Sequence, residues 1–297
     1  MRETERPGTI RAAGAEGAGT SPYRGPLKAV VFDWAGTLVD FGSLAPMGVF
    51  VDVFARFGLE ITISEARAFM GLPKRDHIKG LLELPRIAEA FRARYGRPPA
   101  EDDIDEIYSV FLPANVAAIP ANSGIVPGAA DIITRLRERG MKIGSTTGYT
   151  REIMDVMLPL AARQGVHVES LVCAGDLAWG RPTPMMMYRT FLELGVWPAA
   201  AVVKVDDTPV GIEEGCAAGA WSIGVAVSGN GFGLSKADAD ALAPDAFAER
   251  RAAAAEALTA AGAHLVIDTV ADLMPVLAAI EARLDTGRGP EWGPLES

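Results

Sequence analysis

The chain has 297 residues, of which 49% are hydrophobic and 22% charged, so it can bury the cores of a large α/β domain and a smaller one and is not disordered. Its formal net charge of -10, without a Lys/Arg-rich run, argues against nucleic acid or an anionic membrane as a partner. Two isolated cysteines, Cys173 and Cys216, form neither a disulfide framework nor a zinc motif, which predicts a reducing, cytoplasmic location.

Short β-branched runs alternate with helix-length segments along most of the chain. Residues 1–26 come first and combine Gly, Ala, Pro and charge without any period, so we expect a flexible leader. The β-branched runs then begin at residues 28, 141, 170, 201, 221 and 264. Near-continuous apolar strands separated by helices are typical of a parallel sheet covered on both faces. The sequence therefore predicts a doubly wound α/β fold.

The spacing of the runs breaks between the first and the second. Residues 46–122 contain no convincing strand but several stretches of helical period. Ser64 followed by Glu65, and the acidic residues 101–103, indicate helix starts. We predict an inserted helical cap domain at 46–122 and an α/β core formed by 27–45 and 123–284. An Ala-rich helix at 249–262 lies near the end of the core, and residues 285–297 are expected to form a flexible tail.

Chemically capable side chains follow several of the predicted strands. Ligands of open parallel sheets collect at the carboxyl ends of the strands. The residues at or just after these ends are Asp33, Thr147, Gly148, Arg181, Asp206 and Asp207. Taken singly, a strand-terminal Asp is commonly a cap or a turn residue. Taken together, carboxylates suit Mg²⁺, and a hydroxyl with a guanidinium suits phosphoryl oxygens. The set predicts a Mg²⁺ and phosphoryl site.

Four stretches resemble the motifs of a known superfamily. "VVFDWAGTLVD", "GSTTGYT", "GRPTP" and "KVDDT" occur in the order of the four motifs of the haloacid dehalogenase superfamily. Within it, "FDWAGT", "MGLPKRDHI" and "GRPTPMM" are similar to the phosphonoacetaldehyde hydrolases, or phosphonatases. The resemblance covers residues 28–284. It implies a helical cap over the core, a Mg²⁺ cofactor, a small phosphonate substrate and a homodimer joined through the caps.

Ala35 stands where many relatives carry a second acid, and the chemistry explains it. An acid beside the nucleophile helps an alkoxide to leave, whereas cleavage of a carbon–phosphorus bond needs an electron sink. A lysine imine is such a sink. A lysine on a helix is ordinarily solvated, but the resemblance identifies Lys74, in "GLPKRDH", as the imine-forming residue. Its attack requires a pKa below the usual ~10.4, which burial or a cation such as Arg75 or Arg181 would produce.

The resemblance also assigns roles to other residues. It implies that Asp33 attacks phosphorus, that His77 passes protons around the imine, that Met70 lies in the active site and that the backbone carbonyl of Ala35 is a metal ligand. A Met at helical spacing is more often packed in a core, so both interpretations of Met70 stay open. Tyr149 either reaches the substrate or caps the following helix.

The metal-binding stretch departs from the family pattern. Many relatives carry a further acid four residues after the metal-binding Asp, where this chain has Gly211. The chain has an additional acid, Asp206, directly before Asp207. We expect Asp206 to make up the missing charge, directly or through water, and Asp207 to be the surer ligand.

These observations predict Mg²⁺-dependent hydrolysis of the carbon–phosphorus bond of phosphonoacetaldehyde, giving acetaldehyde and phosphate. Two alternatives stay open. One is a phosphatase or phosphomutase of the same superfamily acting on a phosphate ester. The other is a catalytically silent member that binds a metabolite, against which the intact Asp33, Thr147, Arg181 and Asp207 argue.

Overall fold

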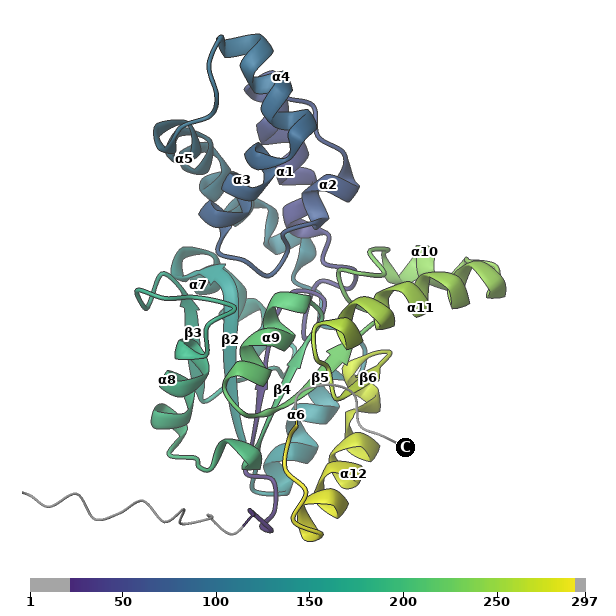
Figure 1. The fold of residues 1–297 in the computed structure, drawn as a ribbon. Helices are drawn as coiled ribbons and strands as arrows, with labels where there is room; N and C mark the ends of the chain where they lie inside the picture. The colour runs from purple at the N-terminus through teal and green to yellow at the C-terminus, as the bar shows by residue number, and fades with distance from the viewer. Residues whose placement is uncertain (1–21, 292–297) are drawn as a thin grey trace, which may run out of the picture.

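The computed structural model describes residues 22–291, which form a parallel sheet covered by helices with a group of further helices above it (Figure 1). The strands are β1 (Ala29–Phe32), β2 (Lys142–Thr150), β3 (Ser170–Ala174), β4 (Val202–Asp206), β5 (Trp221–Val225) and β6 (Leu265–Ile267). Their order in the sheet is β3-β2-β1-β4-β5-β6. The chain thus winds outward in both directions from β1, which confirms the predicted doubly wound fold and puts the order reversal beside β1.

Both faces of the sheet are covered, as the apolar strands predict. In β1, Val30 and Phe32 contribute to the large hydrophobic cluster on one face, whereas Ala29 and Val31 belong to the cluster on the other. The first face carries α6 (Ala129–Glu138), α7 (Arg151–Ala162) and α12 (Leu273–Asp285). The second carries α8 (Met185–Leu194), α9 (Pro209–Ala217) and α11 (Pro244–Ala260), with the short α10 (Lys236–Asp240) at the edge. Burial on both sides explains why the strands are continuously apolar.

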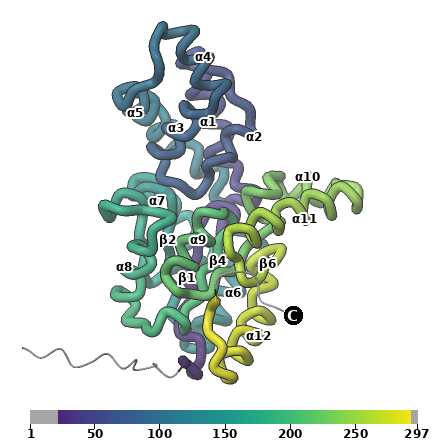
Figure 2. The backbone as a smooth tube through the Cα atoms, in the orientation of Figure 1, coloured from purple at the N-terminus to yellow at the C-terminus, as the bar shows by residue number. Residues whose placement is uncertain are grey.

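Five helices between β1 and β2 lie above the carboxyl ends of the strands (Figure 1). They are α1 (Ala45–Arg56), α2 (Ile63–Arg67), α3 (Lys74–Glu83), α4 (Pro85–Tyr95) and α5 (Glu101–Ala118). Figure 2 shows the chain leaving the sheet after β1, forming this helical region and returning to the sheet through α6. The helical region has a hydrophobic cluster of its own, which includes Phe50, Phe54 and Phe111. The cap boundaries at 46 and 122 stay a prediction that this separate cluster supports.

The start of α2 differs from the sequence-based prediction. The N-cap is Thr62 and not Ser64: the Thr62 hydroxyl accepts a hydrogen bond from the Glu65 amide, and the Glu65 carboxylate accepts one from the Thr62 amide. A capping box needs an acid three positions after the cap. Thr62 has Glu65 at that position, whereas Ser64 has Arg67 there, so Thr62 is the residue that can form the box. The predicted start at Glu101 is confirmed, since α5 begins there.

The two ends of the chain are described only in part. Of the predicted leader, residues 1–21 lie outside the described residues, as do residues 292–297 of the predicted tail. Tyr23 packs against the main hydrophobic cluster, and its hydroxyl donates a hydrogen bond to the Pro26 carbonyl. Within residues 22–291, none of the helices combines the length and apolar character needed to cross a membrane.

Candidate active site

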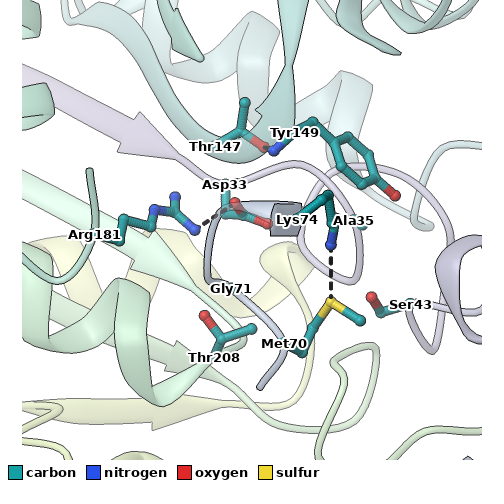
Figure 3. A pocket seen from close by; sticks show the side chains of 11 residues that line it. Asp33, Ala35, Ser43, Met70, Gly71, Lys74, Thr147, Tyr149, Arg181 and Thr208 are labelled. Atoms are coloured by element: carbon teal, nitrogen blue, oxygen red, sulfur yellow. Dashed lines mark hydrogen bonds and ion pairs between the residues drawn. The ribbon is translucent and has the colours of Figure 1, made fainter. Parts of the chain in front are cut away.

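A cavity lies where the carboxyl ends of β1, β2 and β4 meet the segment between α2 and α3 (Figure 3). Its lining residues are Asp33, Ala35, Ser43, Met70, Gly71, Lys74, Thr147, Gly148, Tyr149, Arg181 and Thr208. The fold therefore brings together residues from the core and from the helical region that are far apart in the sequence. Three residues predicted from the sequence are not part of this lining. Asp206 and Asp207 form an acidic cluster with Asp33, and His77 lies near Lys74.

The acidic cluster consists of three buried carboxylates. One carboxylate oxygen from each of Asp33, Asp206 and Asp207 lies within 4.8 Å of the other two. Burial raises the pKa of Asp207 well above its usual value, and the charges of Asp33 and Asp206 add to the effect. Burial and the charge of Asp206 also raise the pKa of Asp33 to about 6, although Arg181 opposes this. A divalent cation between these carboxylates would relieve their repulsion, so the group could hold a metal.

The turn after β1 is shaped around this cluster. Gly36 has a φ of +82°, and a Cβ at this position would lie 2.3 Å from Asp207 Oδ2. Only glycine allows this backbone conformation without strain together with so close an approach. Asp207 is held by the Thr37 hydroxyl at 3.2 Å and by the Asn230 amide at 2.7 Å. The "GT" of the first motif therefore places the turn against Asp207, the acid that directly follows β4.

Asp206 has partners within the protein for both carboxylate oxygens. Oδ1 accepts hydrogen bonds from the Thr208 amide and hydroxyl. Oδ2 lies 3.1 Å from Arg181 Nη2 and 3.0 Å from Lys204 Nζ. Burial alone would raise the pKa of Asp206, but the charges of Arg181 and Lys204 hold it below its usual value. Asp206 is thus an ionised partner of two cations, and its role as a metal ligand stays a prediction.

Arg181 stands at the centre of a buried ionic network. Its Nη1 lies 3.0 Å from Asp33 Oδ1, and its Nε donates to Glu214 Oε2 at 3.0 Å. Lys204 Nζ lies 3.3 Å from the same Glu214 oxygen and donates to the Thr146 hydroxyl at 2.7 Å. The guanidinium is thus held by Asp33, Asp206 and Glu214 at a fixed position in the cavity wall.

Lys74 is the first residue of α3, and its ammonium is buried in the cavity. Nζ lies 3.5 Å from Met70 Sδ, 5.4 Å from the centre of the Tyr149 ring and 5.8 Å from that of Phe50. Burial lowers the pKa of Lys74 to about 8; Asp33 opposes this shift and Arg181 adds to it. A fraction of this amine is therefore neutral, and nucleophilic, near neutral pH.

Arg75, the other cation considered from the sequence, points away from Lys74. Its Nε lies 2.7 Å from Asp105 Oδ1 and its Nη2 lies 2.8 Å from Glu101 Oε2, both on the outside of the helical region. The expectation that Arg75 could lower the Lys74 pKa is not supported by this geometry, because two carboxylates neutralise Arg75. Burial and Arg181 provide the effect.

His77 and Tyr149 both lie near Lys74. His77 Nε2 lies 2.8 Å from the Ala66 carbonyl, so it carries the proton, while Nδ1 has no partner among the described residues. Burial and the charge of Lys74 lower the pKa of His77 well below its usual value, which keeps the ring neutral. The buried Tyr149 hydroxyl likewise has no partner within residues 22–291, and burial raises its pKa well above the usual value. Both polar atoms are available to other groups.

Gly148 marks the contact between the core and the helical region. A Cβ at Gly148 would lie 2.7 Å from the Gly71 carbonyl oxygen, and one at Gly71 would lie 2.5 Å from the Thr208 hydroxyl. The adjacent Thr147 accepts a hydrogen bond from the Tyr149 amide through its hydroxyl. A side chain at either glycine would push the helical region away from the core. Glycine is therefore needed at both positions for the close contact seen between the two regions.

Several residues of the site were not predicted from the sequence. Ser43 lines the cavity with a φ of +51°, and its buried hydroxyl has no partner in the part of the chain that the structure describes. Nothing in the local sequence distinguishes Ser43. Lys204 did carry a signal, since a lysine inside an apolar strand must find a buried anion. Glu214 lies on α9 and carried none, because its partners come from other elements.

Sequence comparisons identify similar proteins. The profile of the haloacid dehalogenase-like hydrolases matches residues 27–219. A phosphonoacetaldehyde hydrolase from Paraburkholderia xenovorans is 58% identical over 264 residues, which cover 89% of this chain and 99% of that protein. A phosphonoacetaldehyde hydrolase from Hahella chejuensis is 46% identical, with 91% of this chain and 92% of that protein covered.

The fold is also similar to a solved structure. A phosphonoacetaldehyde hydrolase-like protein from Oleispira antarctica superposes with a TM-score of 0.89 and 41% sequence identity, over 90% of this chain and 97% of that chain. The similarity extends over the sheet and the helical region together.

Proposed function

This chain belongs to the haloacid dehalogenase-like hydrolases and, within them, to the phosphonoacetaldehyde hydrolases, and from that premise we propose how its site works. The protein hydrolyses the carbon–phosphorus bond of phosphonoacetaldehyde to acetaldehyde and phosphate. The observation that supports a two-residue mechanism is the burial of the Lys74 amine in the same cavity as the Asp33 carboxylate. One residue binds the aldehyde carbon, and the other attacks phosphorus.

The reaction begins at Lys74. Its neutral amine attacks the aldehyde carbon, and loss of water gives a protonated imine. Met70 Sδ lies beside Nζ and orients it. His77 is neutral and has an unpartnered Nδ1, so it can accept and return protons at the nitrogen as the imine forms and breaks. Tyr149 provides a protonated hydroxyl on the other side of the cavity.

Asp33 then attacks phosphorus as a carboxylate. The carbon–phosphorus bond breaks, its electron pair moves into the imine to give an enamine, and the phosphoryl group is transferred to Asp33. Arg181 and Thr147, with the backbone at Gly148, bind phosphoryl oxygens and stabilise the charge that develops there. Protonation and hydrolysis of the enamine release acetaldehyde from Lys74, and water then hydrolyses the aspartyl phosphate.

We propose Mg²⁺ as the metal at the acidic cluster, because all its candidate ligands are oxygens. Asp33, Asp207 and the backbone carbonyl of Ala35 would hold it, with Asp206 as a further candidate. When bound, Mg²⁺ supplies positive charge that offsets the charge on the phosphoryl oxygens. The raised pKa values of Asp33 and Asp207 support this proposal, since they mark carboxylates that lack sufficient neighbouring positive charge.

Borohydride reduction tests the mechanism. Reduction in the presence of phosphonoacetaldehyde should convert Lys74 into a stable secondary amine, detected by mass spectrometry of the Lys74 peptide. Lys74→Ala should lose turnover. Lys79→Ala is the control, because Lys79 lies on the same helix as Lys74 but forms an exposed ion pair with Glu101 of α5. An unmodified Lys74, or full turnover in Lys74→Ala with faster hydrolysis of phosphate esters, would favour an ordinary phosphatase instead.

We also propose that the protein acts in the cytoplasm as a homodimer joined through the helical region, as family resemblance suggests. The apolar side of α1 is already used within the protomer, where Met47, Phe50 and Phe54 are buried. A dimer would therefore use other surfaces of the helical region. Sedimentation velocity at micromolar concentration distinguishes a dimer from a monomer.

A further inference from the structure

Arg67, at the end of α2, reaches from the helical region into the core. Its Nη1 donates hydrogen bonds to the Gly42 carbonyl at 3.0 Å and to Asn230 Oδ1 at 2.9 Å. Its Nη2 donates to the Gly233 carbonyl at 3.1 Å. Gly42 lies between β1 and α1, and Asn230 and Gly233 lie in the loop after β5. One guanidinium therefore joins α2 to two separate loops of the core through neutral acceptors.

Asn230 connects this contact to the acidic cluster. Its side-chain Nδ2 lies 3.4 Å from the Arg67 carbonyl, and its backbone amide donates to Asp207 Oδ2 at 2.7 Å. Arg67, Asn230 and Asp207 also line a common cavity of about 170 Å³, together with Met70. Because Met70 lines the active-site cavity as well, the contact borders the reaction site and is not a remote surface feature.

The core loops are shaped to admit the guanidinium. Gly233 has a φ of +68°, and a Cβ at this position would lie 2.9 Å from Arg67 Cζ. A lysine at position 67 would keep the charge but lacks the planar, forked donors that reach both loops at once. The geometry thus depends on arginine specifically and on a glycine opposite it.

We propose that Arg67 is a positioning residue: by holding Asn230 it fixes the Asp207 carboxylate when the helical region is seated on the core. Lys74 is carried by the helical region, whereas Asp207 belongs to the core. The same contact therefore assembles the lysine and the metal site together, which is the kind of support that neighbouring groups give to metal ligands. This inference rests on the proposed function of the site.

Calorimetric titration of MgCl₂ into the substrate-free protein provides a direct test. Arg67→Ala should raise the Mg²⁺ Kd about ten-fold and lower kcat/KM for phosphonoacetaldehyde by a similar factor. The matched control is Arg97→Ala. Arg97 is an exposed arginine whose ion-pair partner, Asp103, also belongs to the helical region, so this pair does not join the region to the core. This control should stay within about two-fold of the unmodified protein. An unchanged Mg²⁺ Kd in Arg67→Ala, or an equal change in Arg97→Ala, would overturn the proposal.

A double-variant cycle tests the route through Asn230. If Arg67 acts on Asp207 through Asn230, then Arg67→Ala combined with Asn230→Ala should lose no more Mg²⁺ affinity than the worse single variant. A loss equal to the product of the two single losses would overturn the route. Arg67→Lys, which keeps the charge, should change the Kd in the same direction and serves if Arg67→Ala does not fold.

The two proposals can fail separately. Borohydride trapping on Lys74 of the unmodified protein reports only on the proposed function. The change in Mg²⁺ Kd between variants reports only on Arg67. Circular dichroism at the assay temperature confirms that each variant compared is folded.

Discussion

The carboxylate of Asp206 fills the space that a side chain at Gly211 would need, since a Cβ built on Gly211 would lie 2.0 Å from Asp206 Cγ. Position 211 lies on α9 and position 206 ends β4, so the strand and the helix share this space. In this fold, the Asp206 carboxylate and a side chain at position 211 therefore cannot occupy that space together. The carboxylate that fills this space comes from the strand and contacts Arg181 and Lys204.

The space shared by Asp206 and position 211 predicts a compensating pair of substitutions. Gly211→Asp alone should lower kcat/KM at least ten-fold, because its side chain displaces Asp206 from Arg181. Combining Gly211→Asp with Asp206→Gly should restore much of the loss, because a carboxylate from the helix can then enter the same space. The measurement is steady-state phosphate release for both variants. Additive losses in the pair would contradict the shared-space interpretation.

The pKa of Lys74 predicts the alkaline side of the pH profile. Imine formation needs the neutral amine, and the Lys74 pKa is lowered to about 8, with burial as the main cause. The neutral fraction therefore increases steeply with pH below about 8, reaches one half near pH 8 and is nearly complete about one pH unit higher, whereas a solvated lysine would keep gaining beyond its pKa of ~10.4. We expect kcat/KM, and the rate of borohydride trapping, to level off about one pH unit above the Lys74 pKa. A rise that continues to pH 10 would show that Lys74 is exposed to water.

The buried ionic network predicts a large stability effect at Lys204. Lys204→Met keeps much of the side-chain volume but leaves Asp206 and Glu214 with one cation fewer, and removing one partner of a buried ion pair costs about 3–5 kcal/mol. Urea unfolding should show this loss in the free energy of unfolding. Lys142→Met is the control, because its pair with Glu169 is exposed and should change stability little. Similar curves for both variants would contradict the inferred role of the network.

The acidic cluster predicts stabilisation by metal. Mg²⁺ that binds only the folded protein should raise the melting temperature, with a gain of about 2.7 kcal/mol at a hundred-fold excess over Kd. Asp207→Asn should remove most of this shift, whereas Asp268→Asn, at an exposed pair with Arg251, should keep it. Differential scanning fluorimetry with and without EDTA measures the effect. A shift that persists in Asp207→Asn would place the metal elsewhere.

Residues at strand ends were the part of the site that sequence reasoning could find. Asp33 and Asp207 directly follow β1 and β4, Thr147 lies in the last part of β2, and the carboxyl ends of neighbouring parallel strands must meet at one edge of the sheet. Lys74 needed the resemblance, because a lysine at the start of a helix looks like any solvated cation. The structure adds a physical reason: α3 begins at Lys74 and points its side chain into the cavity.

Ser43, Arg67, Asn230 and Glu214 could not be found in this way. Arg67, Asn230 and Glu214 contact partners from distant parts of the chain, such as Glu214 with Arg181 and Arg67 with Asn230, and the Ser43 hydroxyl has no partner among the described residues. The local sequence pattern cannot reveal such pairs, because the residues next to each partner in the sequence are the same whether or not the distant partner exists.

The sequence by itself determined the doubly wound sheet, the inserted helices and the acids at the strand ends, since these follow from hydrophobic period and from where parallel strands stop. The tertiary structure alone decided how the helical region sits on the core, which cations neutralise Asp206, and that Arg75 faces outward while Lys74 is buried. Those outcomes depend on burial and on charge–charge distances across the fold. These distances are set only when segments that are remote in the chain pack against each other.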